Sequence, residues 1–287
     1  EGTAVRDFMH PDRVVIGGDN DKSREIIREL YNVLYLIETP FIFTSIETAE
    51  LVKYASNAFL ATKIAFINEV ANLCDAVGAD VRDIAKAMGM DGRIGKYFLH
   101  PGPGYGGSCL PKDTKALVKI GQEHGTRMSI VDAVVRANES QKHHMVEKIE
   151  TRMAGLEGKI VAVLGLAFKQ GTDDVREASS MPIVRGLIDK GARVKVFDPV
   201  AMEEAQRLYG NRPDLTLVTD PLDALDGADG LAIVTEWHQF RGVDFAAVKA
   251  RLKIPVVFDG RNLFDPRHVS ASGLTYYSIG RTPTTPG

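Results

Sequence analysis

The sequence predicts an α/β protein in three parts: the end of an α/β domain whose first part is missing, an all-α central region, and a C-terminal doubly wound parallel sheet. Three observations support this prediction. Residues 1–45 hold two short apolar runs around a helical pattern, residues 46–154 hold helical patterns, and residues 155–287 alternate apolar runs with helical ones. At 287 residues, 44% of them hydrophobic, the chain is long enough for one large or two ordinary domains.

In the first part, residues 14–16 form a β-branched run that ends at two glycines, which predicts a strand and a turn. Residues 22–36 carry apolar side chains at helical spacing, and residues 41–43 indicate a second strand. Because the chain begins at Glu1 rather than at a methionine, we expect it to be a fragment of a longer protein.

The central part opens with a helical pattern over residues 46–77 that contains neither proline nor glycine and stops at Gly78. At roughly 1.5 Å per residue this helix is about 45 Å long, which is typical of a spine between domains or of a dimer interface. Further helices are predicted over residues 81–88, 113–123 and 129–153.

The C-terminal part contains apolar, strand-like runs at residues 159–165, 193–199, 231–234 and 256–258, with helical patterns between them. This alternation predicts a parallel, doubly wound sheet. The tail over residues 281–287 is rich in proline and threonine, and we expect it to be loosely attached.

The turn after the first of these strands carries part of a dinucleotide-binding pattern. Gly165 follows the strand, and Asp198 comes about thirty residues later. The G-x-G-x-x-G pattern fails because Ala167 and Gln170 occupy the second and third glycine positions. Lys169 in the same turn suits a phosphate or a uracil carbonyl, so the sequence predicts nucleotide binding without the dinucleotide fingerprint.

The most informative segment, residues 104–115, places Cys109 between a glycine-rich approach and the start of a helix, where Pro111 suits the first turn. The positive end of a helix favours a thiolate, and Lys112 adds positive charge. Asp113 supplies a carboxylate that can act as a base or position a water molecule. This pattern favours a nucleophilic cysteine; the alternative is a small buried apolar residue.

Other polar residues have a functional and an ordinary interpretation. Lys53 and Asn57 are four residues apart, so they share one face of the long helix, which can also simply face solvent. Arg93 lies between glycines and binds an anion or faces solvent. Arg261 follows a buried strand, where it grips a phosphate or forms a salt bridge.

Composition excludes several classes. A net charge of −3 gives no nucleic-acid footprint, and no apolar run approaches the roughly 20 residues that span a bilayer. The histidines show no metal-ligand spacing, so no metal is predicted. Two cysteines, Cys74 and Cys109, cannot build a disulfide framework, which favours a cytoplasmic protein.

Five segments together resemble the UDP-glucose 6-dehydrogenase family, a branch of the UDP-glucose/GDP-mannose dehydrogenases: residues 1–4 with 11–14, 53–59, 104–115, 165–169 and 258–261. The resemblance covers essentially the whole chain. It implies NAD as cofactor, UDP-glucose as substrate and a homodimer built on the long helix. It also implies a division into a remnant of a truncated NAD-binding Rossmann domain (1–45), a central helical domain with the catalytic cysteine (46–154) and a UDP-sugar-binding Rossmann-like domain (155–287).

The resemblance assigns catalytic roles by position. Cys109 captures the aldehyde from the first oxidation as a thiohemiacetal, a second oxidation gives a thioester, and water hydrolyses it to UDP-glucuronate. Lys53 and Asn57 stabilise the developing oxyanion. Asp113 orients the hydrolytic water, and Glu1 lies near both the sugar and the nicotinamide.

The resemblance also assigns binding roles. A loop holds the sugar nucleotide through its backbone; it comprises Phe98, Leu99, His100, Pro101 and Gly102, together with Gly106. Lys169 and Arg261 are two cationic contacts to the substrate. Arg93 reaches the substrate of the partner subunit. The cofactor-binding set is Lys112, Arg176 and Glu1. Most of the family's N-terminal domain, which supplies most of the NAD site, has no counterpart in this sequence, so we expect the chain to be inactive alone.

Three alternatives remain. The first is GDP-mannose 6-dehydrogenase; Ser108 before the cysteine argues against the N-acetylmannosamine branch, which tends toward histidine there. The second is a non-catalytic dimer that binds a nucleotide sugar. The third is a cysteine hydrolase, which is disfavoured because no histidine lies in a recognisable motif.

Overall fold

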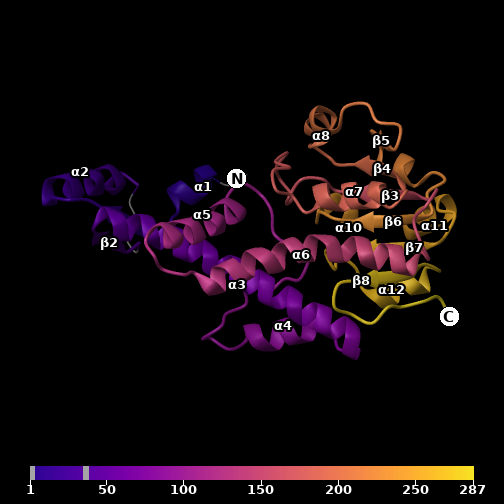
Figure 1. Cartoon of the computed structure of the whole chain (residues 1–287), viewed down its shortest axis with the longest axis horizontal. Coiled ribbons are helices and arrows are strands. Elements are labelled where there is room, and N and C mark those ends of the chain that lie inside the picture. The colour runs from indigo at the N-terminus through magenta and orange to yellow at the C-terminus, as the bar shows by residue number, and fades with distance from the viewer. Residues whose placement is uncertain (1–3, 35–38) are drawn as a thin grey trace. The chain divides into compact units, whose positions relative to one another are not determined.

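The computed structural model describes residues 4–34 and 39–287, and Figure 1 shows the course of the chain. The chain forms two compact units, Glu1–Phe59 and Leu60–Gly287. The boundary between them falls within one helix, α3 (Ile46–Val77). The expected three-part division at residues 45/46 and 154/155 stays a prediction. Glu1 lies outside the described residues.

The first unit contains α1 (Ala4–Met9), β1 (Val14–Gly17), α2 (Asp21–Asn32), β2 (Phe41–Thr44) and the first part of α3. The strands β1 and β2 run parallel, with Val14 opposite Phe41. The Asn20 side chain caps α2 by accepting the Ser23 N–H at 2.9 Å. The predicted strand–helix–strand order is confirmed, although α2 ends at Asn32 and α1 was not predicted.

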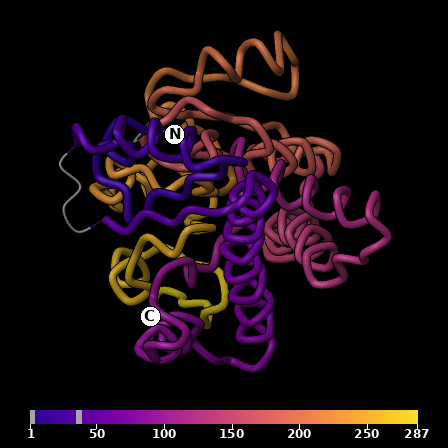
Figure 2. Tube along the Cα trace, turned by 90° about the vertical axis from the view of Figure 1, so that its left-hand side faces the viewer, coloured from indigo at the N-terminus to yellow at the C-terminus, as the bar shows by residue number. Residues whose placement is uncertain are grey.

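The long helix predicted over residues 46–77 is confirmed: α3 spans 32 residues without a break. Figure 2 shows it as one continuous coil. It ends where predicted because Gly78 adopts a left-handed conformation, with φ at 76°.

Three more helices belong to the second unit: α4 (Val81–Gly89), α5 (Leu110–Glu123) and α6 (Ser129–Arg152). The predicted helix over 113–123 starts three residues earlier because Pro111 occupies its first turn. Buried side chains of α3 and α6, among them Ile67 and Ile149, share a core with sheet residues such as Val163. The central helices after residue 59 therefore pack into one body with the sheet.

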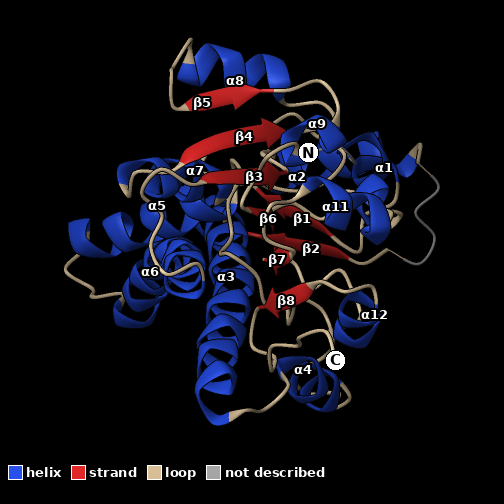
Figure 3. Cartoon of the chain, turned by 90° about the vertical axis from the view of Figure 1, so that its right-hand side faces the viewer, coloured by secondary structure: helices blue, strands red, loops and turns tan. Residues whose placement is uncertain are grey.

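The sheet has six strands in the order β5-β4-β3-β6-β7-β8, and every neighbouring pair is parallel (Figure 3). The strands are β3 (Ile160–Leu164), β4 (Arg193–Phe197), β5 (Leu215–Leu217), β6 (Gly230–Ile233), β7 (Val256–Asp259) and β8 (Thr275–Ser278). The remaining helices are α7 (Ser180–Asp189), α8 (Met202–Tyr209), α9 (Pro221–Leu225), α10 (His238–Arg241), α11 (Phe245–Arg251) and α12 (Pro266–Ala271).

Both faces of this sheet are covered. Val161 and Val163 pack into one apolar core, and Ala162 and Leu164 pack into another. The strand order reverses between β3 and β6, which is where doubly wound sheets bind ligands. The prediction of a doubly wound parallel sheet is confirmed; the edge strands β5 and β8 were not individually predicted.

The expectation of a loose C-terminal tail is wrong for residues 281–284. Arg281 is buried, pairs with Asp80 at 3.3 Å and donates to the Phe264 carbonyl at 3.2 Å. Thr284 exchanges two backbone hydrogen bonds with Tyr276. The proline- and threonine-rich composition of this segment gave no sign of order, because its order comes from contacts with distant residues.

Among the described residues, no helix is both long enough and apolar enough to cross a membrane. In the same residues, no group of three or more His, Cys, Asp or Glu side chains is arranged to hold a metal ion.

Candidate active site

Cys109 is the N-cap residue of α5 and is exposed to solvent. The free N–H groups of the first turn present partial positive charge there. Its sulfur lies 3.7 Å from the Ser108 hydroxyl oxygen. The thiol is therefore accessible and stands at the favourable end of a 14-residue helix.

Asp113 lies one turn along α5, and its backbone N–H donates to the Cys109 carbonyl at 2.9 Å. Its side chain is fully buried, and Lys112 Nζ lies 2.6 Å from its Oδ1 atom. A buried carboxylate is expensive without such a cation. The first turn of α5 therefore holds the thiol, an ammonium and a carboxylate together, as the sequence predicts.

The glycines before Cys109 are required by a close approach of two backbones. A side chain at Gly106 would put its Cβ atom 2.5 Å from the Glu177 carbonyl oxygen. Gly107, with φ at 84°, donates its N–H to the Arg176 carbonyl at 3.0 Å. Only glycine fits both demands. The glycines therefore allow residues 102–109, which we call the cysteine loop, to pack closely against residues 176–178.

Side-chain amides hold the backbone of the same loop. The Gly102 N–H donates to Asn68 Oδ1 at 2.8 Å, and its carbonyl accepts from Gln141 Nε2 at 2.9 Å. The Tyr105 backbone pairs in the same two-sided way with the Asn138 side chain, at 2.8 and 3.0 Å. Ser179 Oγ donates to the Gly104 carbonyl at 2.9 Å.

A group of charges lies beside these glycines. Lys142, whose side chain is 4% exposed, lies 2.9 Å from Glu139 and 3.6 Å from Glu177. Lys115 lies 3.1 Å from Glu177. Partial burial alone would raise the pKa of Glu177, but Lys115 and Lys142 outweigh it and hold that pKa below its usual value.

Residues of the predicted substrate loop line a pocket of about 640 Å³. Leu99, His100, Pro101 and Arg261 all border it. Its other charged side chains are mostly basic: Arg82, Lys86, Lys96 and Arg241, against Asp83 and Glu236. A pocket of this size and sign suits an anionic ligand such as a nucleoside diphosphate.

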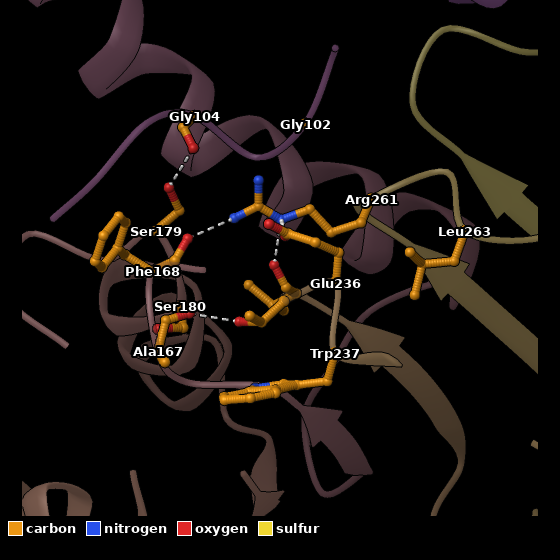
Figure 4. A network of polar contacts seen from close by, with 12 residues as sticks. Gly102, Gly104, Ala167, Phe168, Ser179, Ser180, Glu236, Trp237, Arg261 and Leu263 are labelled. Atoms are coloured by element: carbon orange, nitrogen blue, oxygen red, sulfur yellow. Dashed lines mark hydrogen bonds and ion pairs between the residues drawn. The ribbon is translucent and has the colours of Figure 1, made fainter. Parts of the chain in front are cut away.

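Arg261 is fixed from several sides (Figure 4). Its Nε–H donates to the Val234 carbonyl at 2.7 Å, and Nη2 donates to the Phe168 carbonyl at 3.2 Å. Glu236 Oε2 lies 3.0 Å from Nε and completes an ion pair. A side chain at Gly102 would put its Cβ atom 3.2 Å from Nη1, so the guanidinium lies against the substrate loop.

The loop that carries Arg261 is organised by Asp259, which is fully buried at the end of β7. Its carboxylate accepts the N–H groups of Arg261 at 2.9 Å and Leu263 at 2.7 Å, and the Tyr276 hydroxyl at 2.8 Å. Burial raises the pKa of Asp259, while these donors oppose the rise.

The turn after β3 does not fit a dinucleotide. In dinucleotide sites an acidic residue at the end of the next strand binds a ribose. Here Asp198 Oδ2 accepts the N–H groups of Leu166 at 2.7 Å and Ala167 at 3.0 Å, and Trp237 Nε1–H at 3.0 Å. The carboxylate is therefore occupied by the protein itself, which agrees with the incomplete glycine pattern.

Other predicted residues are not among those that line this pocket. Lys53 and Asn57 are on α3 in the first unit, where they line a hollow of about 470 Å³ with Asp12 and Arg13. Lys169 lies partly buried with its Nζ atom 5.4 Å from the Phe168 ring centre.

The two remaining arginines are engaged locally. Arg93 is 90% exposed and pairs with Asp91 at 2.6 Å, and Arg176 pairs with Asp174 at 2.8 Å. Phe98 adopts a left-handed conformation with φ at 63°, at the entry to the substrate loop. Such strain persists only where surrounding contacts enforce it.

Sequence reasoning missed the residues that hold the cysteine loop in place. A signal was present, because polar residues at 138, 141 and 142 recur on one helical face that also carries Val134 and Met145. A buried polar face on a helix indicates that another backbone docks there.

Two family models match the chain. One, described as the UDP-glucose/GDP-mannose dehydrogenase family, central domain, matches residues 47–140. The other, described as the UDP binding domain of the same family, matches residues 162–266. Between them they cover both the cysteine loop and most of the six-stranded sheet.

Whole-chain relatives are similar throughout. A UDP-glucose 6-dehydrogenase of Rhizobium meliloti is 48% identical over 98% of this chain, and one of Bacillus subtilis is 44% identical over 98%. A UDP-glucose dehydrogenase structure from Pyrobaculum islandicum superposes with a TM-score of 0.88 at 40% identity, over 98% of this chain and 62% of that one. This chain spans 64% and 60% of the length of the two curated relatives.

Proposed function

Because the chain belongs to the UDP-glucose/GDP-mannose dehydrogenase family, we propose that it serves the NAD-dependent, four-electron oxidation of UDP-glucose to UDP-glucuronate. The observation that carries the proposal is the exposed Cys109 thiol at the N-terminus of α5, beside the Lys112–Asp113 pair. An accessible thiol at a helix N-terminus is suited to nucleophilic attack.

In this proposal Cys109 makes and breaks one covalent bond. Loss of a hydride and a proton from the C6 alcohol gives an aldehyde, and the thiolate adds to its carbonyl carbon to form a thiohemiacetal. Loss of a second hydride and proton gives a thioester, and water then releases the carboxylate and the free thiol. NAD, when bound, accepts the hydride in each of the two oxidations.

Four further residues stabilise charge, position water or act as acid and base in this proposal. The Lys53 ammonium and Asn57 amide donate to the oxygen that becomes negative as the thiohemiacetal forms. Asp113, held by Lys112, orients the hydrolytic water toward the thioester carbonyl. Glu1 takes a further acid–base role near the sugar.

The substrate occupies the basic pocket in this proposal. The backbone of residues 98–102 and of Gly106 holds the sugar nucleotide, Arg261 grips a phosphate or the sugar, and Lys169 contacts the uridine. Support comes from the pocket's excess of arginine and lysine and from the fixed guanidinium of Arg261. Arg93 reaches the substrate of a partner subunit.

NAD contacts in the proposal are Lys112, Arg176 and Glu1. The turn after β3 is no part of them, because Asp198 is occupied by backbone N–H groups and Trp237. We further propose a homodimer built on α3 and a cytoplasmic location, which two free cysteines support.

A protection experiment tests the proposal. UDP-glucose should bind in isothermal titration and slow the alkylation of Cys109 by iodoacetamide, whereas a Cys109→Ser variant should bind without incorporating label. Failure of UDP-glucose to bind, or an unchanged alkylation rate when it is bound, would contradict the proposed site. Formation of NADH from UDP-glucose and NAD reports turnover, and we expect none from this chain alone.

The same titration separates the branches of the family. UDP-glucose and UDP-glucuronate should bind more tightly than GDP-mannose. A preference for the guanosine ligand would overturn the substrate assignment. Binding of a nucleotide sugar without any effect on Cys109 would favour the non-catalytic alternative.

A further inference from the structure

A further, smaller cavity lies between α3 and α6. It has a volume of about 140 Å³ and is lined only by side chains of these two helices. From α3 come Ala65, Asn68, Glu69 and Asn72, and from α6 come Ala137, Ser140, Gln141, His144 and Glu147. We refer to it as the α3–α6 cavity.

Three polar atoms of this lining are buried without a hydrogen-bond partner among the described residues: Asn68 Nδ2, Asn72 Oδ1 and His144 Nε2. Asn68 itself is only 2% exposed. Buried polar atoms are almost always satisfied by protein or by ordered water. Three unsatisfied atoms around one cavity therefore indicate an occupant that can both donate and accept hydrogen bonds.

Water fits this requirement. The cavity has room for several water molecules, and its walls offer the polar partners that a buried water needs. A metal ion does not fit, since no suitable group of three His, Cys, Asp or Glu side chains occurs in the described part of the chain.

The other ends of the same side chains hold the substrate loop. Asn68 Oδ1 accepts the Gly102 N–H at 2.8 Å. Asn72 Nδ2 donates to Gln141 Oε1 at 2.9 Å, and Gln141 Nε2 donates to the Gly102 carbonyl at 2.9 Å. Gly102 is thus held on both sides by amides that border the cavity.

We propose that the α3–α6 cavity is a binding site for a cluster of ordered water, and that Asn72 and His144 are positioning residues that hold the substrate loop at Gly102 through this cluster. That the water cluster affects substrate binding rests on the proposed function of residues 98–102. That it holds the backbone of Gly102 does not depend on that function.

His144 makes the cluster sensitive to pH. Burial, and then the nearby Lys148, lower the pKa of His144, while Asp75 and Glu147 oppose this shift. Glu69 and Glu147 also border the cavity, and Lys148 is itself paired with Asp75 at 2.6 Å. Protonation adds one N–H donor and a positive charge to the imidazole, which reorders the water that joins His144 to Asn72.

Hydrogen exchange at Gly102 tests the proposal without any ligand. Ala137→Leu places a larger apolar side chain in the cavity and displaces water, whereas Ala133→Leu alters an exposed position on the same helix. We expect the amide of Gly102 to exchange at least about tenfold faster in A137L and at the wild-type rate in A133L. Equal exchange in both variants would overturn the proposal.

Two variants of His144 separate positioning from simple packing. His144→Gln keeps a hydrogen-bonding group and should retain slow exchange at Gly102, while His144→Leu should lose it. Because the pKa of His144 is held below the usual histidine value of 6.5, protection in the wild type, corrected for intrinsic exchange, should fall as the pH drops below 6.5. H144Q should show no such fall. The same pH step in H144Q would exclude His144.

UDP-glucose binding then tests the link to substrate. The dissociation constant should rise in the wild type as the pH falls below 6.5 and stay constant in H144Q. If UDP-glucose fails to bind the wild type at any pH, the proposed function fails, while the exchange result still decides the cavity. A crystal structure that shows the cavity dry, or filled by a side chain of a second copy, would also overturn the water site.

Discussion

Lys142 and Glu177 approach to 3.6 Å beside the glycines that lead to Cys109. The lysine comes from α6 and is almost wholly buried, and Glu177 adopts a left-handed conformation with φ at 51°. The backbone carbonyl of Glu177 also packs against Gly106 of the cysteine loop. Glu177 therefore joins the two: its side chain pairs with Lys142, and its backbone contacts the loop.

Replacing the buried cation should weaken this arrangement. We expect Lys142→Met to lower the free energy of unfolding by about 1 kcal/mol, since Glu139 and Glu177 are partly exposed and water replaces part of the lost attraction. Lys119→Met, which removes an exposed pair with Glu123 at 3.8 Å, should change it by less than about 0.5 kcal/mol. Urea unfolding of both variants measures the difference, and equal values would contradict a special role for Lys142.

The ionised Glu177 side chain should contribute to the loss of unfolding free energy at acidic pH. Its pKa is lowered in the folded state, so the folded form binds fewer protons and its stabilising contribution is present at neutral pH. That contribution should disappear as the pH falls below about 4.5 and through the lowered pKa. Unfolding free energies between pH 7 and pH 3 should fall less steeply in Glu177→Gln than in the wild type, and a parallel fall would refute the assignment.

Gly106→Ala should disturb the cysteine loop. The new Cβ atom would lie 2.5 Å from the Glu177 carbonyl oxygen and 2.8 Å from the Ala178 Cα atom, so one backbone must move. We expect a loss of about 1–3 kcal/mol in the free energy of unfolding and weaker UDP-glucose binding. Gly92→Ala is the matched control, because nothing lies within 4 Å of a Cβ atom at that position. Wild-type behaviour of both variants would show that the loop is not tightly packed there.

The two thiols should differ sharply in reactivity. Cys109 is exposed, whereas Cys74 is 2% exposed and burial raises the pKa of its thiol. Iodoacetamide near neutral pH should therefore label Cys109 first, and Cys74 only after urea unfolds the chain. Peptide mass spectrometry identifies the labelled residue, with Cys109→Ser as the control. Comparable labelling of both thiols in the folded protein would count against a reactive Cys109.

Features encoded locally were predictable. The ends of α3 follow from the absence of breakers and from Gly78, and the start of α5 follows, to within three residues, from Pro111. Strand β5 was missed because it has only three residues, and β8 because its sequence, Thr-Tyr-Tyr-Ser, is largely polar.

The tertiary contacts of the site were not predictable in the same way. Cys109, Asp113 and Lys112 fall within one turn, so their proximity follows from sequence. The grip of Asn138 on Tyr105 joins residues 33 positions apart and exists only because the loop docks on α6. Periodicity locates the helix face but does not identify the backbone that covers it.

The hydrogen bonds of Asp198 bear on any attempt to re-engineer this half of the molecule for another nucleotide. Grafting a glycine-rich phosphate loop onto residues 165–170 would still leave no acceptor for a ribose hydroxyl, because the carboxylate is already committed to Leu166, Ala167 and Trp237. Removing these hydrogen bonds to free the carboxylate would destabilise the turn at residues 165–170 that the graft requires. Although doubly wound sheets commonly bind dinucleotides, the hydrogen bonds of Asp198 therefore keep this sheet from binding one.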